Sequence, residues 1–80
     1  MVALRLFAAA RTSAGTARDD LAGTTVGEVL DGAVARYGRE FAAVLATSAV
    51  WCNGEPADRQ DPVSDDDELA VLPPVSGGTT

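Results

Sequence analysis

The chain has 80 residues, 46% of them hydrophobic, and a formal net charge of −6. A chain of this length forms one domain and buries only about 60% of its unfolded surface, so it leaves little room for a deep pocket. Twelve acidic residues against six basic ones exclude the basic stripe that nucleic-acid binding requires. We therefore expect no nucleic-acid partner, and we expect function on a surface or a terminal segment.

Reactive side chains are scarce in this sequence. All six basic residues are arginines, so there is no lysine, and there is no histidine either. Histidine is the usual general base and the commonest metal ligand. The single cysteine, Cys52, can form neither an internal disulfide nor a paired-thiol metal site. We expect no metal site and no permanently bound cofactor.

The opening stretch VALRLFAAA is expected to be a strand and not a signal segment. No basic residues precede it, and Arg5 interrupts it. Residues 2–8 alternate with a period of two, which predicts a strand. No stretch approaches the roughly 20 apolar residues of a membrane span, so we expect a cytoplasmic protein without a membrane partner.

The middle of the chain predicts a turn, an edge strand and helices. Residues 11–15 resemble a turn, and residues 16–21 form a weaker strand with polar, exposed positions. Thr25 and Glu28 have the spacing of a capping box, and apolar residues then recur at helical spacing as far as Tyr37. Gly38 is a natural helix stop, and a second short helix is expected over residues 39–46.

The remaining elements complete an α+β fold. Residues 49–52 are expected to form a strand before the turn dipeptide Asn53-Gly54, and residues 68–72 a final strand. The order predicts a ubiquitin-like β-grasp roll, a mixed sheet with one main helix across one face. The first and last strands, the most apolar, should lie parallel at its centre. We expect a domain over residues 1–73 and a flexible tail over residues 74–80.

Alternation along the strands assigns three notable side chains to faces of the sheet. If Val50 and Cys52 face the helix, Trp51 lies on the open face, and Phe7 joins it there. Trp51 either covers the sheet or anchors a protein contact, since exposed aromatic residues concentrate at contact centres. Cys52 is expected to be a small buried hydrophobic residue and not a reactive thiol.

The segment PPVSGG gives the tail its chemical character. Pro73 and Pro74 favour an extended conformation and end the last strand. Gly77 and Gly78 have no Cβ atom, so they can pass through a narrow channel in another protein. A free glycine carboxylate exposes its carbonyl carbon, which suits acyl chemistry carried out by a partner. A frayed terminus with two glycines by chance is the alternative.

The ending LPPVSGG, together with VALRLFA, TTVGEVL and VWCNGE, resembles the small subunit of molybdopterin synthase. That subunit belongs to the ubiquitin-like sulfur-carrier family, which has molybdopterin and thiamine branches, and the paired prolines are more typical of the molybdopterin branch. The resemblance implies a carrier that is not itself an enzyme. A ubiquitin-activating-like adenylyltransferase uses ATP to adenylate the terminal glycine, which becomes a thiocarboxylate. The large synthase subunit then takes up its sulfur for molybdenum cofactor biosynthesis.

The resemblance also implies roles for individual residues. Gly78 carries the adenylate and then the thiocarboxylate, and Gly77 gives clearance in the partner's channel. The residues expected to bind a partner, either the large subunit or the activating enzyme, are Phe7, Trp51, Pro73, Pro74, Val75 and Ser76.

Thr79 and Thr80 depart from the family, in which the glycine pair is normally terminal. While they are attached, Gly78 has a peptide bond and no carboxylate. We expect a peptidase to remove them. The alternatives are that the two threonines do not belong to the native protein, or that the protein has lost carrier activity. The alternative functions are a sulfur carrier for thiamine, cysteine or secondary-metabolite biosynthesis, a ubiquitin-like protein modifier, and an inert interaction domain.

Overall fold

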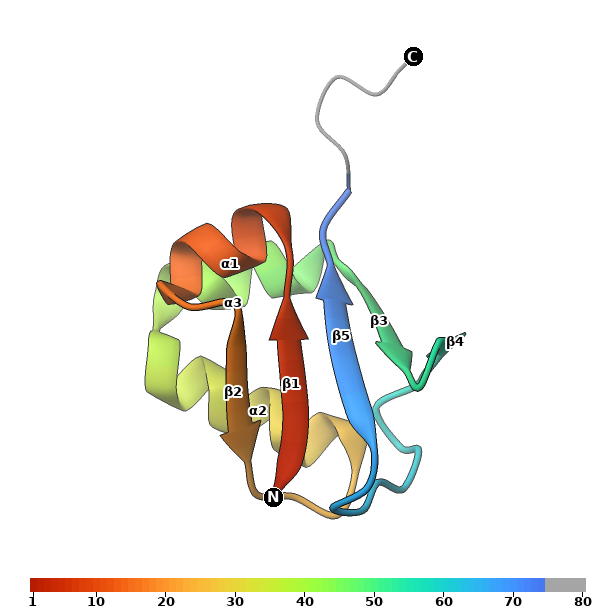
Figure 1. Ribbon diagram of the computed structural model, residues 1–80. Coiled ribbons are helices and arrows are strands. Elements are labelled where there is room, and N and C mark those ends of the chain that lie inside the picture. The colour runs from red at the N-terminus through yellow and green to blue at the C-terminus, as the bar shows by residue number, and fades with distance from the viewer. Residues whose placement is uncertain (75–80) are drawn as a thin grey trace.

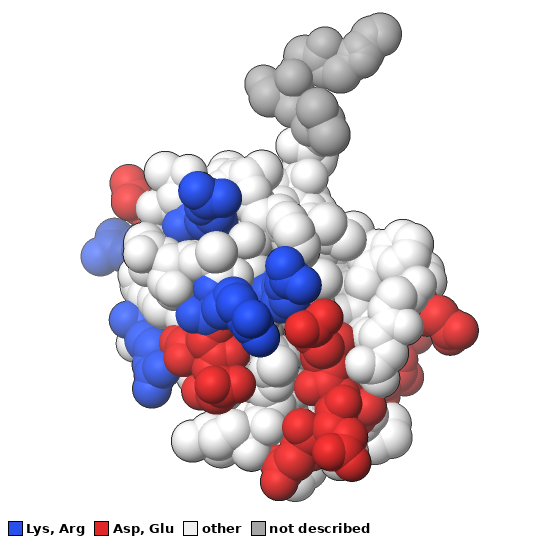
Figure 2. All heavy atoms as spheres, in the orientation of Figure 1, with Lys and Arg blue, Asp and Glu red and all other residues white. Residues whose placement is uncertain are grey.

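A mixed five-stranded sheet is the frame of the fold, and the computed structural model describes residues 1–74. The strands lie in the order β2-β1-β5-β3-β4. The elements along the chain are β1 (Val2–Leu6), α1 (Ala8–Ala14), β2 (Arg18–Leu21), α2 (Val26–Tyr37), α3 (Arg39–Ala46), β3 (Ala49–Cys52), β4 (Glu55–Pro56) and β5 (Glu68–Leu72). Helices α2 and α3 lie behind the sheet in Figure 1, so its open face is turned to the viewer in Figures 1 and 2.

The two most apolar strands form the centre of the sheet. β1 and β5 run parallel, with Leu4 opposite Leu69 and Leu6 opposite Val71. β2 pairs antiparallel with β1 on one side, and β3 pairs antiparallel with β5 on the other. The predicted parallel pairing of the first and last strands is therefore confirmed, as is the α+β, β-grasp arrangement.

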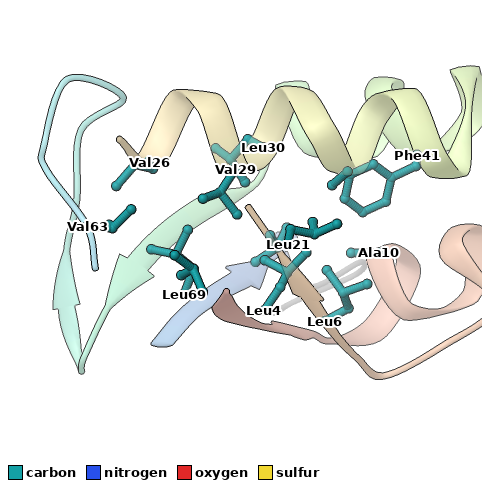
Figure 3. Close-up of a cluster of buried hydrophobic side chains, with 13 residues drawn as sticks. Leu4, Leu6, Ala10, Leu21, Val26, Val29, Leu30, Phe41, Val63 and Leu69 are labelled. Atoms are coloured by element: carbon teal, nitrogen blue, oxygen red, sulfur yellow. The ribbon is translucent and has the colours of Figure 1, made fainter. Parts of the chain in front are cut away.

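The core lies between the inner face of the sheet and the helices (Figure 3). Leu4 and Leu69 are fully buried there, and they face α2 and the ring of Phe41 on α3. The Phe41 ring packs edge-on against Tyr37, with 5.2 Å between the ring centroids. No polar or charged side chain is buried within residues 1–74, so burial of apolar side chains is the main stabilising contribution in this layer.

Helix α2 begins and ends where its sequence predicts. The Thr25 hydroxyl accepts a hydrogen bond from the Glu28 N–H at 3.2 Å, as a capping residue does. The Glu28 carboxylate in turn accepts from the Thr24 N–H and hydroxyl, at 2.8 and 2.9 Å. These two bonds lower the pKa of Glu28 below its usual value. Gly38, with φ of 97°, separates α2 from α3 in a backbone conformation that favours glycine.

Two elements differ from the sequence prediction. Residues 11–15, expected to be a turn, belong mostly to helix α1, which ends at Gly15 with φ of 77°. Only Ala10 of this helix is buried, so the sequence shows no apolar stripe. The helix forms nevertheless, because alanine has the highest helix propensity. The two-residue strand β4 was not predicted; it follows the predicted Asn53-Gly54 turn and pairs with β3.

Candidate functional site

The candidate site is the end of the sheet at which β5 stops. This central strand ends at Leu72, because the prolines that follow cannot donate hydrogen bonds to a neighbouring strand. Pro73 is half-buried and Pro74 is exposed, at the upper end of the sheet in Figure 1. The other predicted tail residues lie outside the described residues: Val75, Ser76, Gly77, Gly78, Thr79 and Thr80.

A continuous row of side chains crosses the open face of the sheet. Strand pairing places its members directly opposite one another: Arg18 on β2, Arg5 on β1, Ala70 on β5, Trp51 on β3 and Pro56 on β4. Successive side chains of a strand point to opposite faces, and the neighbours of these residues on the central strands are buried in the core. The row therefore faces away from the helices.

Phe7 and Trp51 lie on either side of β5, as alternation predicts. Phe7 follows β1, is 37% exposed, and donates its N–H to the carbonyl of Val71 on β5 at 3.3 Å. Trp51 is half-buried on β3, opposite Ala70 of β5. The guanidinium carbon of Arg5 lies 5.6 Å from the centroid of the Phe7 ring, in the range of a cation–π contact. Two aromatic side chains thus flank the strand that leads to the tail.

Charge is divided along the open face. Figure 2 shows basic side chains in the half nearer to the tail and acidic side chains mainly at the opposite end. The turn before β5 supplies part of the acidic end. The Asp67 carboxylate accepts hydrogen bonds from the Asn53 side-chain amide and from the Ser64 N–H, both at 2.8 Å, and these lower the pKa of Asp67. The turn before β5 is therefore ordered in part by hydrogen bonds to the Asp67 carboxylate.

Cys52 does not have the environment of a reactive thiol. It is half-buried and packs against the core, as expected from its place in the strand. Burial raises the pKa of the Cys52 thiol, and the negative charges of Asp67 and Asp61 raise it further. A thiol in this state is a poor nucleophile. Within residues 1–74, no three histidine, cysteine or acidic side chains come together to hold a metal ion. No helix in that part is long and apolar enough to cross a membrane.

Sequence reasoning missed two clusters that only the tertiary structure brings together. The pairing of Arg5 with Arg18 depends on strand register, which the sequence does not specify by itself. Asp19, on the inner side of β2, accepts hydrogen bonds from Arg36 and from the Tyr37 hydroxyl on α2. This second cluster fastens the edge strand to the helix, so its role is structural.

Comparison with known proteins agrees with this geometry. The sequence pattern of the ThiS family matches residues 4–78. The chain is 33% identical to SAMP1, the small archaeal modifier protein 1 of Haloferax volcanii, with a TM-score of 0.77 over 96% of this chain and 98% of that one. It is 26% identical to a chain of the BexX/CysO complex of Amycolatopsis orientalis, with a TM-score of 0.82 over 98% and 100%.

A complex of subunits 1 and 2 of the molybdopterin-converting factor of Helicobacter pylori 26695 contains the same fold. The identity is 23% and the TM-score is 0.68, over 96% of this chain and 97% of that one. No curated protein sequence matches the chain. Because the ThiS pattern covers residues 4–78, from the middle of β1 through the glycine pair, this chain belongs to the ThiS family of ubiquitin-like sulfur carriers.

Proposed function

We propose that this protein is the small subunit of a molybdopterin synthase and that Gly78 carries the sulfur. The observation that carries the proposal is the way the central strand ends. β5 stops at Leu72, beside Phe7 and Trp51, and the sequence PPVSGG follows directly. Family membership supports a sulfur carrier, and the paired prolines support the molybdopterin branch. The chain would present an acyl group, and its partners would carry out the chemistry.

The proposed chemistry takes place at one carbon atom, the carbonyl carbon of Gly78. A carboxylate oxygen of Gly78 attacks the α-phosphorus of ATP, and pyrophosphate leaves. A sulfide then attacks the carbonyl carbon of the adenylate, and AMP leaves with the bonding electrons. The sulfur of the resulting thiocarboxylate attacks a carbon of a pterin precursor on the large subunit and displaces an oxygen leaving group, which forms a thioester with Gly78. Water then hydrolyses this thioester, so the sulfur stays on the pterin and the Gly78 carboxylate is restored. The carrier supplies only the electrophilic carbon and the surface that positions it.

Processing has to precede this chemistry, because Gly78 is joined to Thr79 in the sequence. A peptidase that hydrolyses the bond between Gly78 and Thr79 would release a glycine carboxylate and the residues after it. Glycine has no side chain, so the bond is accessible to a narrow active site. Intact-mass measurement after incubation in a lysate of the host would detect the loss of these residues. Retention of Thr79 on carrier that is active in sulfur transfer would contradict this step.

The test is a reconstitution with purified components. A form that ends at Gly78 is incubated with ATP, sulfide and the adenylyltransferase, and then with the large synthase subunit and a pterin precursor. The expected result is molybdopterin, detected by the fluorescence of its oxidised form, with none from the matched chain that retains Thr79 and Thr80. A parallel reaction offers the acceptor of the thiamine pathway. Sulfur transfer only to that acceptor would contradict the molybdopterin assignment and leave the sulfur carrier intact.

A protein modifier is the second candidate function, and the 33% identity to a small archaeal modifier protein favours it. In this case, the activated Gly78 would form an isopeptide bond with a lysine of another protein. Expression of a tagged form that ends at Gly78 would then yield a ladder of larger tagged products. A form that ends at Gly77 is the control, and a ladder that persists in it would exclude conjugation through Gly78.

A further inference from the structure

A groove lies on the helix side of the molecule, where α2 and α3 meet β3. The buried Leu30 of α2 lines it together with the half-buried Leu45 and Val50 and the exposed Ala46 at the end of α3. Its volume is about 380 Å³, at the lower end of the range of ligand sites. Because α2 and α3 lie behind the sheet in Figure 1, the groove is separated from the open face. It has room for an apolar side chain of a partner.

Arg59 lines one side of this groove and is held in place by α2. One of its guanidinium nitrogens donates to a carboxylate oxygen of Asp31 at 2.6 Å and to the carbonyl of Gly27 at 3.4 Å. A Cβ atom on Gly27 would lie 3.3 Å from the Nε of Arg59, so a side chain there would crowd the guanidinium group. Glycine weakens a helix relative to alanine, and this close approach accounts for its presence. Arg59 is therefore a positioned wall of the groove.

Arg59 also lines a second hollow, which is acidic. Glu28 and Asp31 of α2 line this hollow with it. Asp31 is exposed and gives one carboxylate oxygen to Arg59, while its other oxygen accepts no hydrogen bond from residues 1–74. Asp58 directly precedes Arg59 in the chain, so acidic side chains outnumber the arginine here. The local charge is therefore negative and attracts cations.

We propose that the two hollows together form a docking site for a basic, amphipathic segment of a partner protein. An apolar side chain of that segment would occupy the groove beside Leu45 and Val50, and a neighbouring arginine or lysine would pair with Asp31. Charge complementarity selects this kind of partner, because a nucleic acid or an acidic peptide would be repelled by Glu28, Asp31 and Asp58.

This site is independent of the proposed function, because it uses none of the residues assigned to the carrier reaction. In that reaction, successive enzymes occupy the tail, and each one releases Gly78 before the next one binds. A partner seated on the helix side is compatible with every one of these steps. A second contact of this kind raises the effective concentration of a carrier near its enzymes.

The test titrates the full chain with a synthetic peptide and follows the backbone amide signals by NMR. The probe is a hexapeptide with leucine at its first and fourth positions, arginine at its fifth and sixth, alanine elsewhere, and blocked ends. The expected result is saturable shifts at Asp31, Ala46 and Val50, and none at Arg5 and Arg18 on the open face.

Matched substitutions on α3 locate the site. Ala46→Arg is expected to weaken the affinity for the peptide at least about tenfold, because the new side chain fills the groove and adds a like charge. The control Ala43→Arg makes the same change at an exposed position of α3 that does not line the groove, and it should change the affinity by less than about twofold.

A second pair of variants tests the acidic hollow. Asp31→Asn is expected to weaken the affinity about fivefold, because it removes the carboxylate that receives the cation and leaves Arg59 without its ion pair. The control Asp20→Asn makes the same change of charge on β2, at the far edge of the sheet, and it should change the affinity by less than about twofold.

Stability separates docking from a structural role. Ala46 and Asp31 are exposed, so Ala46→Arg and Asp31→Asn should unfold at urea concentrations close to that of the unmodified chain. Parallel losses of stability and affinity would assign these residues to the fold and overturn the inference.

Three further outcomes would overturn the inference: no saturable shifts in the unmodified chain, unchanged affinity in Ala46→Arg, or equal binding of a peptide whose arginines are replaced by glutamates. Shifts at the groove that depend on the concentration of the chain alone would identify a second copy as its occupant, which also overturns the inference. The measurement does not involve Gly78, so failure of the proposed function would leave its result unaffected.

Discussion

The two faces of the sheet are built from alternate residues of the same strands, yet they differ in nearly every physical property. Leu4 and Leu6 of β1 are 0% and 2% exposed, whereas Arg5 between them is exposed. The inner face is apolar except for Asp19 on the edge strand β2, and helices cover it, whereas the open face carries paired cations and aromatic rings. One face therefore determines stability, and the other remains available to a partner.

The largest expected effect on stability comes from replacing a phenylalanine with alanine on the inner side of the sheet, compared with the same replacement on the open face. Phe41→Ala should destabilise the fold by about 3–5 kcal/mol, because Phe41 is fully buried against Tyr37. Phe7→Ala should cost about 1 kcal/mol or less, because Phe7 is exposed. Urea unfolding of both variants measures the difference. Equal losses of stability would contradict the division between the faces.

Affinity for a partner should depend on the open face instead, and two neighbouring residues of β3, Trp51 and Val50, allow the comparison. Trp51→Ala should cost about 2 kcal/mol of affinity for the adenylyltransferase, since tryptophan is a frequent interface anchor. Val50→Ala should reduce stability instead, because Val50 packs against the core, and should leave the affinity of the folded protein unchanged. Calorimetry at a temperature at which both variants are folded tests the pair. Retained affinity in Trp51→Ala would show that Trp51 does not anchor this contact.

The edge strand β2 provides a pH-dependent test of the inner side. Hydrogen bonds from the Tyr37 hydroxyl and Arg36 lower the pKa of Asp19 in the folded protein. The contribution of Asp19 to the free energy of unfolding is therefore fully present above its pKa in the unfolded chain, and it is lost as the pH falls through its pKa in the folded protein. Burial and the hydrogen bond to Asp19 raise the pKa of Tyr37 to about 12. The contribution of Tyr37 to the free energy of unfolding is therefore lost as the pH rises from about 10 to about 12.

Asp19→Asn should therefore flatten both limbs of the stability profile and cost about 1 kcal/mol at neutral pH. The acid limb should not disappear, because Glu28 and Asp67 also have lowered pKa values. Urea unfolding over a pH series gives the profile, and the absorbance of the Tyr37 phenolate gives its titration. An unchanged Tyr37 titration in the variant would show that the pKa of the Tyr37 hydroxyl does not depend on Asp19.

The smallest expected effect concerns the like-charge pair. Arg18→Gln should raise the free energy of unfolding by roughly 0.2–1 kcal/mol, because it relieves the repulsion between Arg18 and Arg5. Arg11→Gln is the matched control and should have the opposite sign, since Arg11 lies in the last turn of α1, where a cation is favourable. A loss of stability in Arg18→Gln would mean that the pair supports the fold and does not strain it.

Sequence periodicity predicted most of the strands, helix α2 and the faces of Phe7 and Trp51. It succeeded there because burial on one face imposes a period of two on a strand and of about 3.6 on a helix, and because a capping box marks the start of a helix. It failed for α1, in which alanines contribute to helix formation but give no apolar stripe. It also missed β4, a strand of two residues that includes Pro56 and exists only through pairing with β3.

The candidate site was predictable in part. The glycine pair and the prolines are local features of the sequence, so their chemistry can be inferred without a structure. Arg5 and Arg18 are 13 residues apart in the sequence, and their pairing depends on the register of two strands. The contact of Asp19 with Tyr37 depends on the packing of a helix on an edge strand. Such contacts follow from the whole fold and not from any short pattern.

The most direct test of the central claim asks which atom of the chain is activated. The form that ends at Gly78 is incubated with the adenylyltransferase, ATP and sulfide, and tandem mass spectrometry locates the added sulfur. We expect that sulfur replaces one carboxylate oxygen of Gly78, and that the chain retaining Thr79 and Thr80 gains no sulfur. Sulfur on Cys52, or on the unprocessed chain, would contradict it.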